Sequence, residues 1–190
     1  GVYIDRDAEL TAAVRAKAGW LWTGRRGIVA GFSAAALHGS KWVDDGRVVE
    51  LIHNNHHRSA GIQLHRDIVA ADEIEILGGL TVTSPPRTAL DLGCWYPTMT
   101  AVAGIDALAG ATEIKAADIE LLARRYPGRR GIARARRATD LFDPGAQSPK
   151  ESWLRVVVIE AGMPQPQTQI PVFDEFGNVF AYLDMGWEEA

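Results

Sequence analysis

Hydrophobic and polar positions change their spacing along the chain, and these changes predict where helices and strands lie. Helical spacing comes first in "AELTAAVRAKAG", a segment that Asp7 can cap and Gly19 can end. A short apolar run, "GIVAGF", is then typical of a buried strand, and Ser33 is a good N-cap for the following "AAALHG". Three strand-like pieces come next, separated by turns and by the charged stretch "DEIEIL"; they are "RVVELIH", "GIQLH" and "LTVT".

Helical spacing dominates from "TVTSPPRTALDLG" onward, where Ser84 or Thr83 can cap a helix with proline in its first turn. Three more helices are predicted between Gly and Pro breaks; they are "TMTAVAGIDALAG", "KAADIELLARRY" and "RRGIARARRATDLF". The segment "DPGAQSP" then has the composition of a linker. The pattern therefore predicts an α+β fold, a small mixed sheet with helices over residues 1–143, followed by a second unit over residues 144–190.

The second unit is predicted to be a helix followed by a β-hairpin. Ser148 or Pro149 begins the helix "KESWLRVVVIEAG", and a turn at 174–178, where Gly177 can take a positive φ, joins the two strands. Because one helix and two strands bury too little surface to be stable alone, this unit is expected to be incomplete. The helix residues expected to face a core are Trp153, Leu154, Val157, Val158 and Ala161.

Composition limits the classes of function that are open to the chain. A chain of 190 residues with 47% hydrophobic content can bury a core. It has no apolar run near the roughly 20 residues that span a bilayer, and its first residues do not resemble a signal peptide, so a cytoplasmic location without membrane contact is expected. The single Cys94 excludes an intramolecular disulfide, and it is predicted to be a buried apolar group rather than a nucleophile.

Charge is distributed unevenly around a net value of -4. Residues 124–137 contain seven arginines and no acid, whereas the chain from residue 144 onward is acidic. If a helix begins near Gly131, arginines spaced three and four residues apart share one side and can contact phosphates. The alternative is that they pair with the acidic C-terminal segment, or with Asp140 and Glu120. The candidate nucleic-acid-binding residues are Arg129, Arg130, Arg134 and Arg137.

Most of the histidines lie in the segment "HNNHHRSAGIQLH". Their spacing matches no zinc motif, and the Asn, Ser and Gly around them indicate a turn rather than a metal site. The histidines of this segment are His53, His56, His57 and His65. By contrast His38, in "ALHGS", is predicted to cap a helix end or to be a buried hydrogen-bonding group rather than a base.

The last part of the chain resembles a nuclease family. The segment "SPKESWLRVVVIEAGMPQPQTQIPVFDEFGNVFAYLDMGW" is similar to the opening of the very-short-patch-repair-like (DUF559-type) branch of the PD-(D/E)XK endonucleases. In that family an acid on the first helix precedes a hairpin with a metal-binding aspartate, and Glu151 and Asp184 match these two positions. The resemblance implies a partial restriction-endonuclease-like α/β unit in which Asp184 binds Mg²⁺ for phosphodiester hydrolysis.

The same resemblance predicts that this chain is inactive. The family continues with a third strand that carries another acid, and no such strand follows here, so Mg²⁺ is expected to bind weakly or not at all. Two structural alternatives remain for the candidate residues. Asp184 can be a solvated charge on an edge strand, and Glu151 can stabilise the positive end of its helix. Glu188 and Glu189 are predicted to be solubilising.

A second resemblance covers the earlier part of the chain. The segments "GFSAAALHG", "GIQLHR", "LTVTSPPRTALDLG" and "GRRGIARARRATDL" are similar, in order and spacing, to the middle of actinobacterial AbiEi-family antitoxins or regulators. In those proteins a winged helix usually comes first, so residues 1–4, "GVYI", are expected to be the end of its wing. This resemblance implies DNA as a partner. Two alternatives to a nuclease function stay open. The chain can be a DNA-binding antitoxin with a cognate toxin, or a partner-binding scaffold that keeps the nuclease fold without its chemistry.

Overall fold

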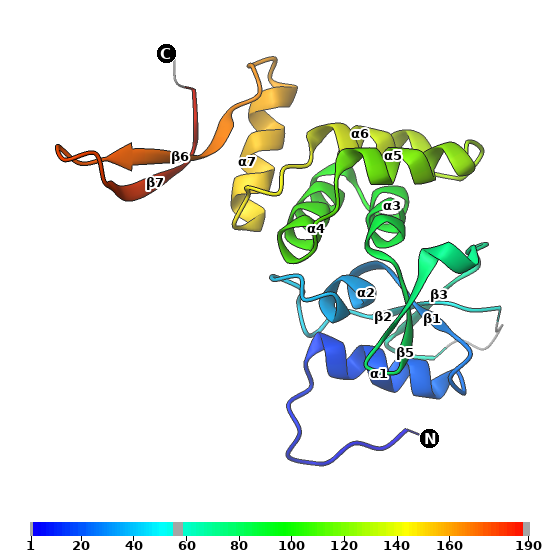
Figure 1. Cartoon of the computed structure of the whole chain (residues 1–190). Helices are drawn as coiled ribbons and strands as arrows, with labels where there is room; N and C mark the ends of the chain where they lie inside the picture. Colours follow the sequence, from blue (N-terminus) through cyan, green and yellow to red (C-terminus); the bar gives the residue numbers. More distant parts are fainter. Residues whose placement is uncertain (1, 55–58, 188–190) are drawn as a thin grey trace.

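The computed structural model describes residues 2–54 and 59–187, which form an α+β fold (Figure 1). These residues make seven α-helices, one short 3-10 helix, a five-stranded mixed sheet and a separate two-stranded sheet. The fold class expected from the hydrophobic pattern is therefore confirmed. None of the described helices is long and apolar enough to cross a membrane. The predictions for Gly1, His56, His57, Glu188 and Glu189 concern residues outside the described ranges.

The five-stranded sheet has the order β3-β2-β1-β5-β4 and combines parallel with antiparallel pairs. The pairs β1–β5 and β2–β3 are parallel, whereas β1–β2 and β4–β5 are antiparallel. All four residues of β2 are buried, and because successive side chains point to opposite faces, both faces of this strand are covered. The strands are β1 (Ile28–Val29), β2 (Val49–Ile52), β3 (Ile62–His65), β4 (Ile74–Leu77) and β5 (Leu80–Thr83).

The first helix, α1 (Ala12–Trp22), begins later and ends later than its sequence pattern predicts. The side chain of Thr11 caps it by accepting a hydrogen bond from the Val14 amide, so the proposed cap at Asp7 was wrong. The helix also continues through Gly19, which is buried because α1 lies against β2 at this point. A residue without a side chain permits this close approach, and its packing value outweighs its poor helix propensity.

Two further local predictions were wrong for tertiary reasons. Helix α2 (Gly31–Leu37) starts before Ser33, so this serine lies inside the helix, where its Oγ accepts a hydrogen bond from the Glu50 amide. The charged stretch "DEIEIL" is not a connection, because its residues form the end of the 3-10 helix η1 (Ala71–Glu73) and the edge strand β4. An edge strand with one exposed face tolerates charges that a central strand does not.

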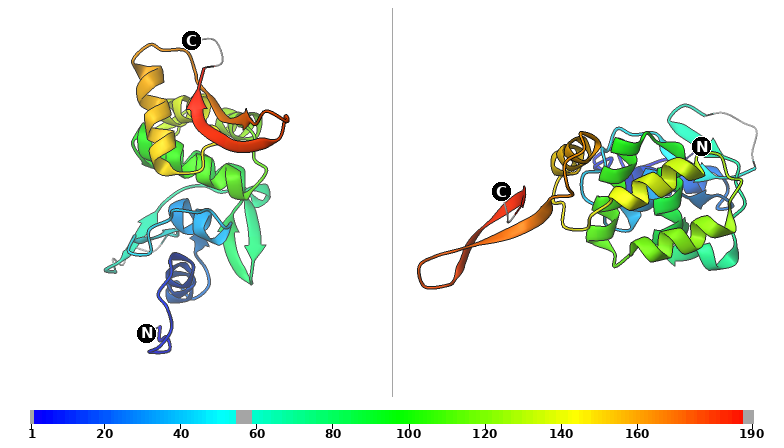
Figure 2. Two further views of the ribbon diagram at one scale, coloured as in Figure 1. Left: turned by 90° about the vertical axis from the view of Figure 1, so that its left-hand side faces the viewer. Right: turned by 90° about the horizontal axis from the view of Figure 1, so that it is seen from above.

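Four helices form a layer above the sheet, as Figure 1 and Figure 2 show. Their positions agree with the sequence prediction, including Ser84 at the N-cap position of α3 and proline in its first turn. Helix α3 packs against α4, α5 and α6, and most of the larger hydrophobic core lies among these helices. The helices are α3 (Pro85–Trp95), α4 (Thr98–Ala111), α5 (Ala116–Arg125) and α6 (Ile132–Leu141).

A buried ionic cluster joins this helical layer to the sheet. The fully buried Arg87 on α3 donates from Nε to Asp91 Oδ1 at 2.8 Å and from Nη1 to Glu73 Oε2 at 2.5 Å. Its Nη2 lies 3.2 Å from Asp67 Oδ2, in the segment after β3. Burial opposes the charge of Arg87, but the three carboxylates outweigh burial and raise its pKa, so the guanidinium stays charged.

The C-terminal unit consists of α7 (Pro149–Glu160) and a hairpin of β6 (Gln167–Phe173) and β7 (Val179–Gly186). Helix α7 packs against α4 through its buried residues Ser152, Arg155 and Val156. The predicted orientation of α7 was wrong, because the apolar side chains of Trp153, Leu154 and Val157 are exposed. A buried carboxylate on α4, Asp106, decides the orientation, since it binds the polar face of the helix.

The hairpin extends away from the rest of the molecule (Figure 1, Figure 2). Its turn has the predicted position, and Gly177 has φ +82°, the left-handed conformation that glycine adopts most easily. Asp174 Oδ1 accepts hydrogen bonds from the amides of Phe176 and Asn178, which stabilises the turn. Large apolar side chains on both strands and the turn are exposed; they are Phe173, Phe176, Val179, Phe180, Tyr182 and Leu183.

Replacing Arg87 with methionine tests the importance of the buried cluster. The Arg87→Met variant keeps most of the side-chain volume but leaves three acids without their central partner, so we expect a loss of about 3–5 kcal/mol in the free energy of unfolding. Urea denaturation measures this loss. The control is Arg124→Ala on α5. It removes an exposed ion pair with Glu120 of that helix and should lower the free energy of unfolding by only about 0.3–0.5 kcal/mol. Equal losses in the two variants would contradict the prediction.

Candidate nucleic-acid interface

A groove of about 860 Å³ lies where the end of β3, the last turn of α3 and the start of α6 meet. Helix α6 approaches α3 closely because Gly131, with φ +87°, lies directly against the carbonyl of Cys94, where a Cβ would collide. The charged residues that line the groove are mostly basic, and the structure places three of the four predicted arginines there. The charged lining residues are Arg66, Arg129, Arg130, Arg134 and Asp67.

The four candidate arginines have different environments. Arg129 has a side chain that is only 9% exposed, and its Nη2 lies 2.5 Å from Asp67 Oδ2 and 2.6 Å from Asp91 Oδ1. It is thus the outer member of the Arg87 cluster. Among the described residues, none accepts a hydrogen bond from its buried Nη1 atom. One part of this guanidinium is fixed by carboxylates, and the other lacks a partner.

Arg134 is held by the end of α3. Its Nε donates to the Gly93 carbonyl at 3.2 Å, and its Nη2 donates to the Cys94 carbonyl. The last carbonyls of a helix have no partner within the helix, so this arginine satisfies acceptors that would otherwise be unpaired. The role is structural, and it also fixes the relative position of the two helices that form the groove.

Arg130 and Arg137 are both exposed, and neither makes an ion pair with any residue in the described ranges. Only Arg130 lines the groove. The alternative of pairing with acids is confirmed for one predicted partner, because Arg124 and Arg136 both approach Glu120, at 3.3 and 3.5 Å. Residues 2–54 and 59–187 contain no ion pair between the arginine-rich segment and the acidic C-terminal segment.

Two aromatic rings complete the groove. The imidazole of His65, at the end of β3, stacks on the indole of Trp95, with a centroid separation of 3.5 Å and an interplanar angle of 4°. The His65 Nε2 atom lies 3.2 Å from Oε1 of the buried Glu50. Glu50 Oε2 also accepts a hydrogen bond from the Phe32 amide at 2.8 Å. His65 is therefore fixed by a strand, a carboxylate and an aromatic ring; it belongs to the predicted strand "GIQLH" and not to the turn predicted for the wider histidine segment.

Sequence analysis missed the contributions of Glu50 and Trp95. A possible signal was the single carboxylate in the otherwise apolar strand "VELI", because a buried acid requires a partner. The other histidine prediction is confirmed: His38 is at the C-cap of α2, and its Nε2 lies 2.7 Å from the Thr83 carbonyl oxygen.

Glu151 has a local structural role at the start of α7. Its Oε1 accepts a hydrogen bond from Ser148 Oγ at 2.6 Å, and its Oε2 accepts one from the Gln147 amide at 2.9 Å. The Glu151 amide in turn donates to Ser148 Oγ at 3.3 Å. Ser148 caps the helix through the Glu151 amide, and Glu151 in turn holds the Ser148 hydroxyl and the Gln147 amide just before the helix.

Asp184 lies on β7 and is exposed. Its side chain makes no hydrogen bond or ion pair with any other residue that the structure describes. In the described part of the chain, no group of three or more His, Cys, Asp or Glu side chains is arranged to hold a metal ion. Binding of Mg²⁺ at Asp184 therefore stays a prediction that rests on the nuclease resemblance.

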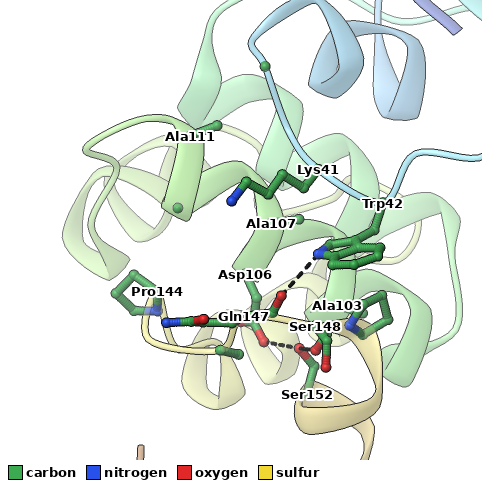
Figure 3. Close-up of a pocket in the computed structure, with 14 residues that line it drawn as sticks. Lys41, Trp42, Ala103, Asp106, Ala107, Ala111, Pro144, Gln147, Ser148 and Ser152 are labelled. Carbon is green, nitrogen blue, oxygen red and sulfur yellow. Dashed lines mark hydrogen bonds between the residues drawn. The ribbon is translucent and has the colours of Figure 1, made fainter. Parts of the chain in front are cut away.

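A second cavity, of about 410 Å³, lies between residues 39–42, α4 and the linker before α7 (Figure 3). Asp106 and Ser152 are both buried in its lining, and Asp106 accepts hydrogen bonds from Ser152 Oγ at 2.5 Å and from Arg155 Nη2 at 2.6 Å. Trp42 Nε1 also donates to the Gln147 carbonyl at 3.0 Å (Figure 3). These polar groups hydrogen-bond to one another and so are not free for a ligand. We therefore interpret the cavity as part of the contact that attaches the C-terminal unit to α4.

The prediction for the single cysteine is confirmed. Cys94 is a free thiol with 3% of its surface exposed, at the end of α3 beneath the groove. Burial raises the pKa of this thiol, which keeps it in the protonated form that is a poor nucleophile.

Comparison with known proteins identifies two similar chains. The uncharacterized proteins MT2308 and Rv2248 of Mycobacterium tuberculosis are each 28% identical to this chain over 131 residues, which is 69% of this chain and 47% of the relative. The chain thus spans about half the length of the curated relatives it matches. No protein-family model matches the chain. No solved structure matches it either.

The thiol offers a direct test of burial at the groove. In the folded protein, Cys94 should react with a thiol reagent such as Ellman's reagent much more slowly than in urea, because it is buried and protonated. The absorbance of the released thiolate measures both rates, and a Cys94→Ala variant provides the blank. Similar rates in the folded and unfolded protein would show that the region beneath the groove is open to solvent.

Proposed function

We propose that this chain belongs to a DNA-acting protein related to the Mg²⁺-dependent PD-(D/E)XK endonucleases, and that it contacts DNA through the groove beside α6. The observation that carries the proposal is the gathering of four arginines on this groove in a chain whose net charge is -4. Lysine and arginine contacts to phosphates supply most of the sequence-independent affinity for DNA. A local positive surface on an acidic protein is what such binding requires.

The distribution of arginine contacts supports the same function. Arg129 forms ion pairs with acids, and Arg134 donates hydrogen bonds to helix carbonyls. These two arginines therefore provide a rigid base for the groove. Arg130 and Arg137 have no such contacts with described residues, and their charge is directed to solvent. A solvated guanidinium loses little on meeting a phosphate, because it breaks no internal pair to do so.

The C-terminal unit fits the proposed relationship to nucleases in its order of elements, a helix followed by a hairpin with Asp184 on its second strand. Exposed apolar side chains on both the helix and the hairpin support the idea that further strands pack on this unit in the related nucleases. In the described residues Asp184 belongs to no group of three or more His, Cys, Asp or Glu side chains that could hold a metal ion, and one carboxylate holds Mg²⁺ weakly. We therefore propose that the chain alone does not cleave DNA.

A DNA-binding antitoxin or regulator is the second candidate. The use of Glu151 as a capping residue favours it, because this function needs no metal ligand at the start of α7. The exposed apolar face formed by Trp153, Leu154 and Val157 suits contact with a protein partner such as a cognate toxin. Both candidates act on DNA in the cytoplasm, and both depend on the basic groove.

DNA binding can be measured by fluorescence anisotropy at several salt concentrations. The protein should bind labelled DNA, with log K falling linearly against log salt concentration as counterions are released. The double charge reversal Arg130→Glu and Arg137→Glu should weaken binding at least about tenfold, the loss expected from about 1.4 kcal/mol. The control reverses two exposed lysines away from the groove, Lys41→Glu and Lys150→Glu, and changes the net charge equally. Equal losses in both double variants would argue against a specific interface.

Cleavage separates the two candidate functions. With Mg²⁺ and supercoiled plasmid, we expect no nicking by this chain, because the described residues contain no group of three or more acidic, His or Cys side chains that could hold a metal ion. Agarose gel electrophoresis of the plasmid, with and without a chelator, provides the measurement. Nicking that requires Mg²⁺ and disappears in Asp184→Asn would show an active site and would contradict the proposed inactivity. The Asp174→Asn variant, which changes another hairpin carboxylate, is the control.

A further inference from the structure

We infer that the groove between β3, α3 and α6 binds an unpaired stretch of DNA rather than the outside of a duplex. This inference rests on the proposed function, since it assumes that DNA is the ligand. It specifies the form of DNA and the chemistry that recognises it. Single-strand sites combine cationic groups for the backbone with aromatic rings for the bases, and the groove has both.

Two arginines can contact the phosphate backbone of the DNA strand, one at the surface of the groove and one deeper. Arg130 is exposed at the groove, where its guanidinium can meet a phosphate without losing an internal partner. Arg129 lies deeper, and its Nη1 atom is buried with no acceptor in the described ranges. A buried charged nitrogen without an acceptor is costly, so this atom favours an incoming anion. Asp67 and Asp91 hold the other side of the guanidinium, which leaves this nitrogen in a fixed position.

The base contacts are provided by the aromatic pair. His65 and Trp95 lie parallel in the groove lining and present rings that are partly exposed. The bases of a duplex are stacked on one another, so they reach a ring in a groove only when they leave the helix or are already unpaired. The location of the two rings, beside the buried Arg129, therefore favours a strand whose bases are free to stack.

Two walls of the groove are held in place by internal hydrogen bonds, and the groove is open to the surface. Its volume of about 860 Å³ is near the upper end of the range of roughly 300–1,000 Å³ for small-ligand sites, and it is open to the surface, so a strand can pass through it. The bonds of Arg134 to the end of α3 fix one wall, and the bond between His65 and Glu50 fixes the other. A site that is rigid before binding loses less conformational entropy when it orders its ligand.

Anisotropy with two probes tests the inference. The probes are a fluorescein-labelled thymidine oligonucleotide of about 12 nucleotides and a duplex of equal length. Stacking of even one base should make the single strand bind at least about fivefold tighter than the duplex.

Arg130→Ala should weaken single-strand binding at least about threefold and reduce the slope of log K against log salt by about 0.7, as expected for one lost phosphate contact. The control is Lys150→Ala, which removes an exposed cation on α7 outside the groove and should leave single-strand affinity unchanged.

Photocrosslinking locates the bases independently of affinity. A single strand that contains 5-iodouracil should crosslink on irradiation to the peptides that hold His65 or Trp95, because the photoproduct forms with a neighbouring aromatic ring. Mass spectrometry of a tryptic digest identifies these peptides. An excess of thymidine 5′-monophosphate should compete poorly, since it offers one phosphate and one base. If it displaced the strand at similar concentrations, the groove would be a site for small phosphates and the inference would be overturned.

The outcomes distinguish this inference from the function on which it rests. If neither the single strand nor the duplex binds in a salt-sensitive way, the proposed function is overturned. Binding of the duplex as tightly as the single strand leaves the proposed function intact but overturns the inference. Equal losses in Arg130→Ala and Lys150→Ala, or crosslinks confined to other peptides, also overturn the inference.

Discussion

The buried guanidinium of Arg87 is the interaction on which the arrangement of the main domain depends. An unpaired charge at this depth would be prohibitively costly, so the fold is possible only when acids from several segments converge on it. Asp67, Glu73 and Asp91 do so, and they come from the end of the sheet, the 3-10 helix and α3. Because Asp67 and Asp91 also bind Arg129, the same cluster fixes the base of the groove. The stability of the domain and the shape of its candidate site are therefore physically coupled.

A second buried pair determines how the C-terminal unit is attached. Arg155 and Asp106 bind each other between α7 and α4, and Ser152 completes the contact. The helix consequently turns its polar side inward and leaves Trp153 and Leu154 at the surface. This arrangement has two effects at once. It fixes the base of a projecting hairpin, and it leaves an apolar surface beside that hairpin for further structure or a partner.

The basic segment illustrates how residues of one type divide between structure and function. Arg129 and Arg134 satisfy acids and helix carbonyls, and in doing so they make the groove rigid. Arg130 is directed to solvent and provides charge where the groove opens. The two roles are complementary, because electrostatic attraction to a phosphate becomes selective only when the donors are held in a defined geometry. The proposed relationship to nucleases and the proposed antitoxin function share this surface.

The sequence by itself determined most of the helices and the position of the hairpin. Its periodicity and its Gly and Pro breaks placed helices α3 to α7 and the C-terminal hairpin, because these signals act over a few residues. It could not determine which face of α7 is buried or that α1 continues through Gly19, since both depend on partners distant in the chain. The candidate site shows the same division. The arginine-rich segment was visible in sequence, whereas the stacking of His65 on Trp95 and the pairing of Arg129 with Asp67 were not. Only tertiary structure decided which arginines are neutralised and which remain exposed, because a charge finds its partner through space and not along the chain.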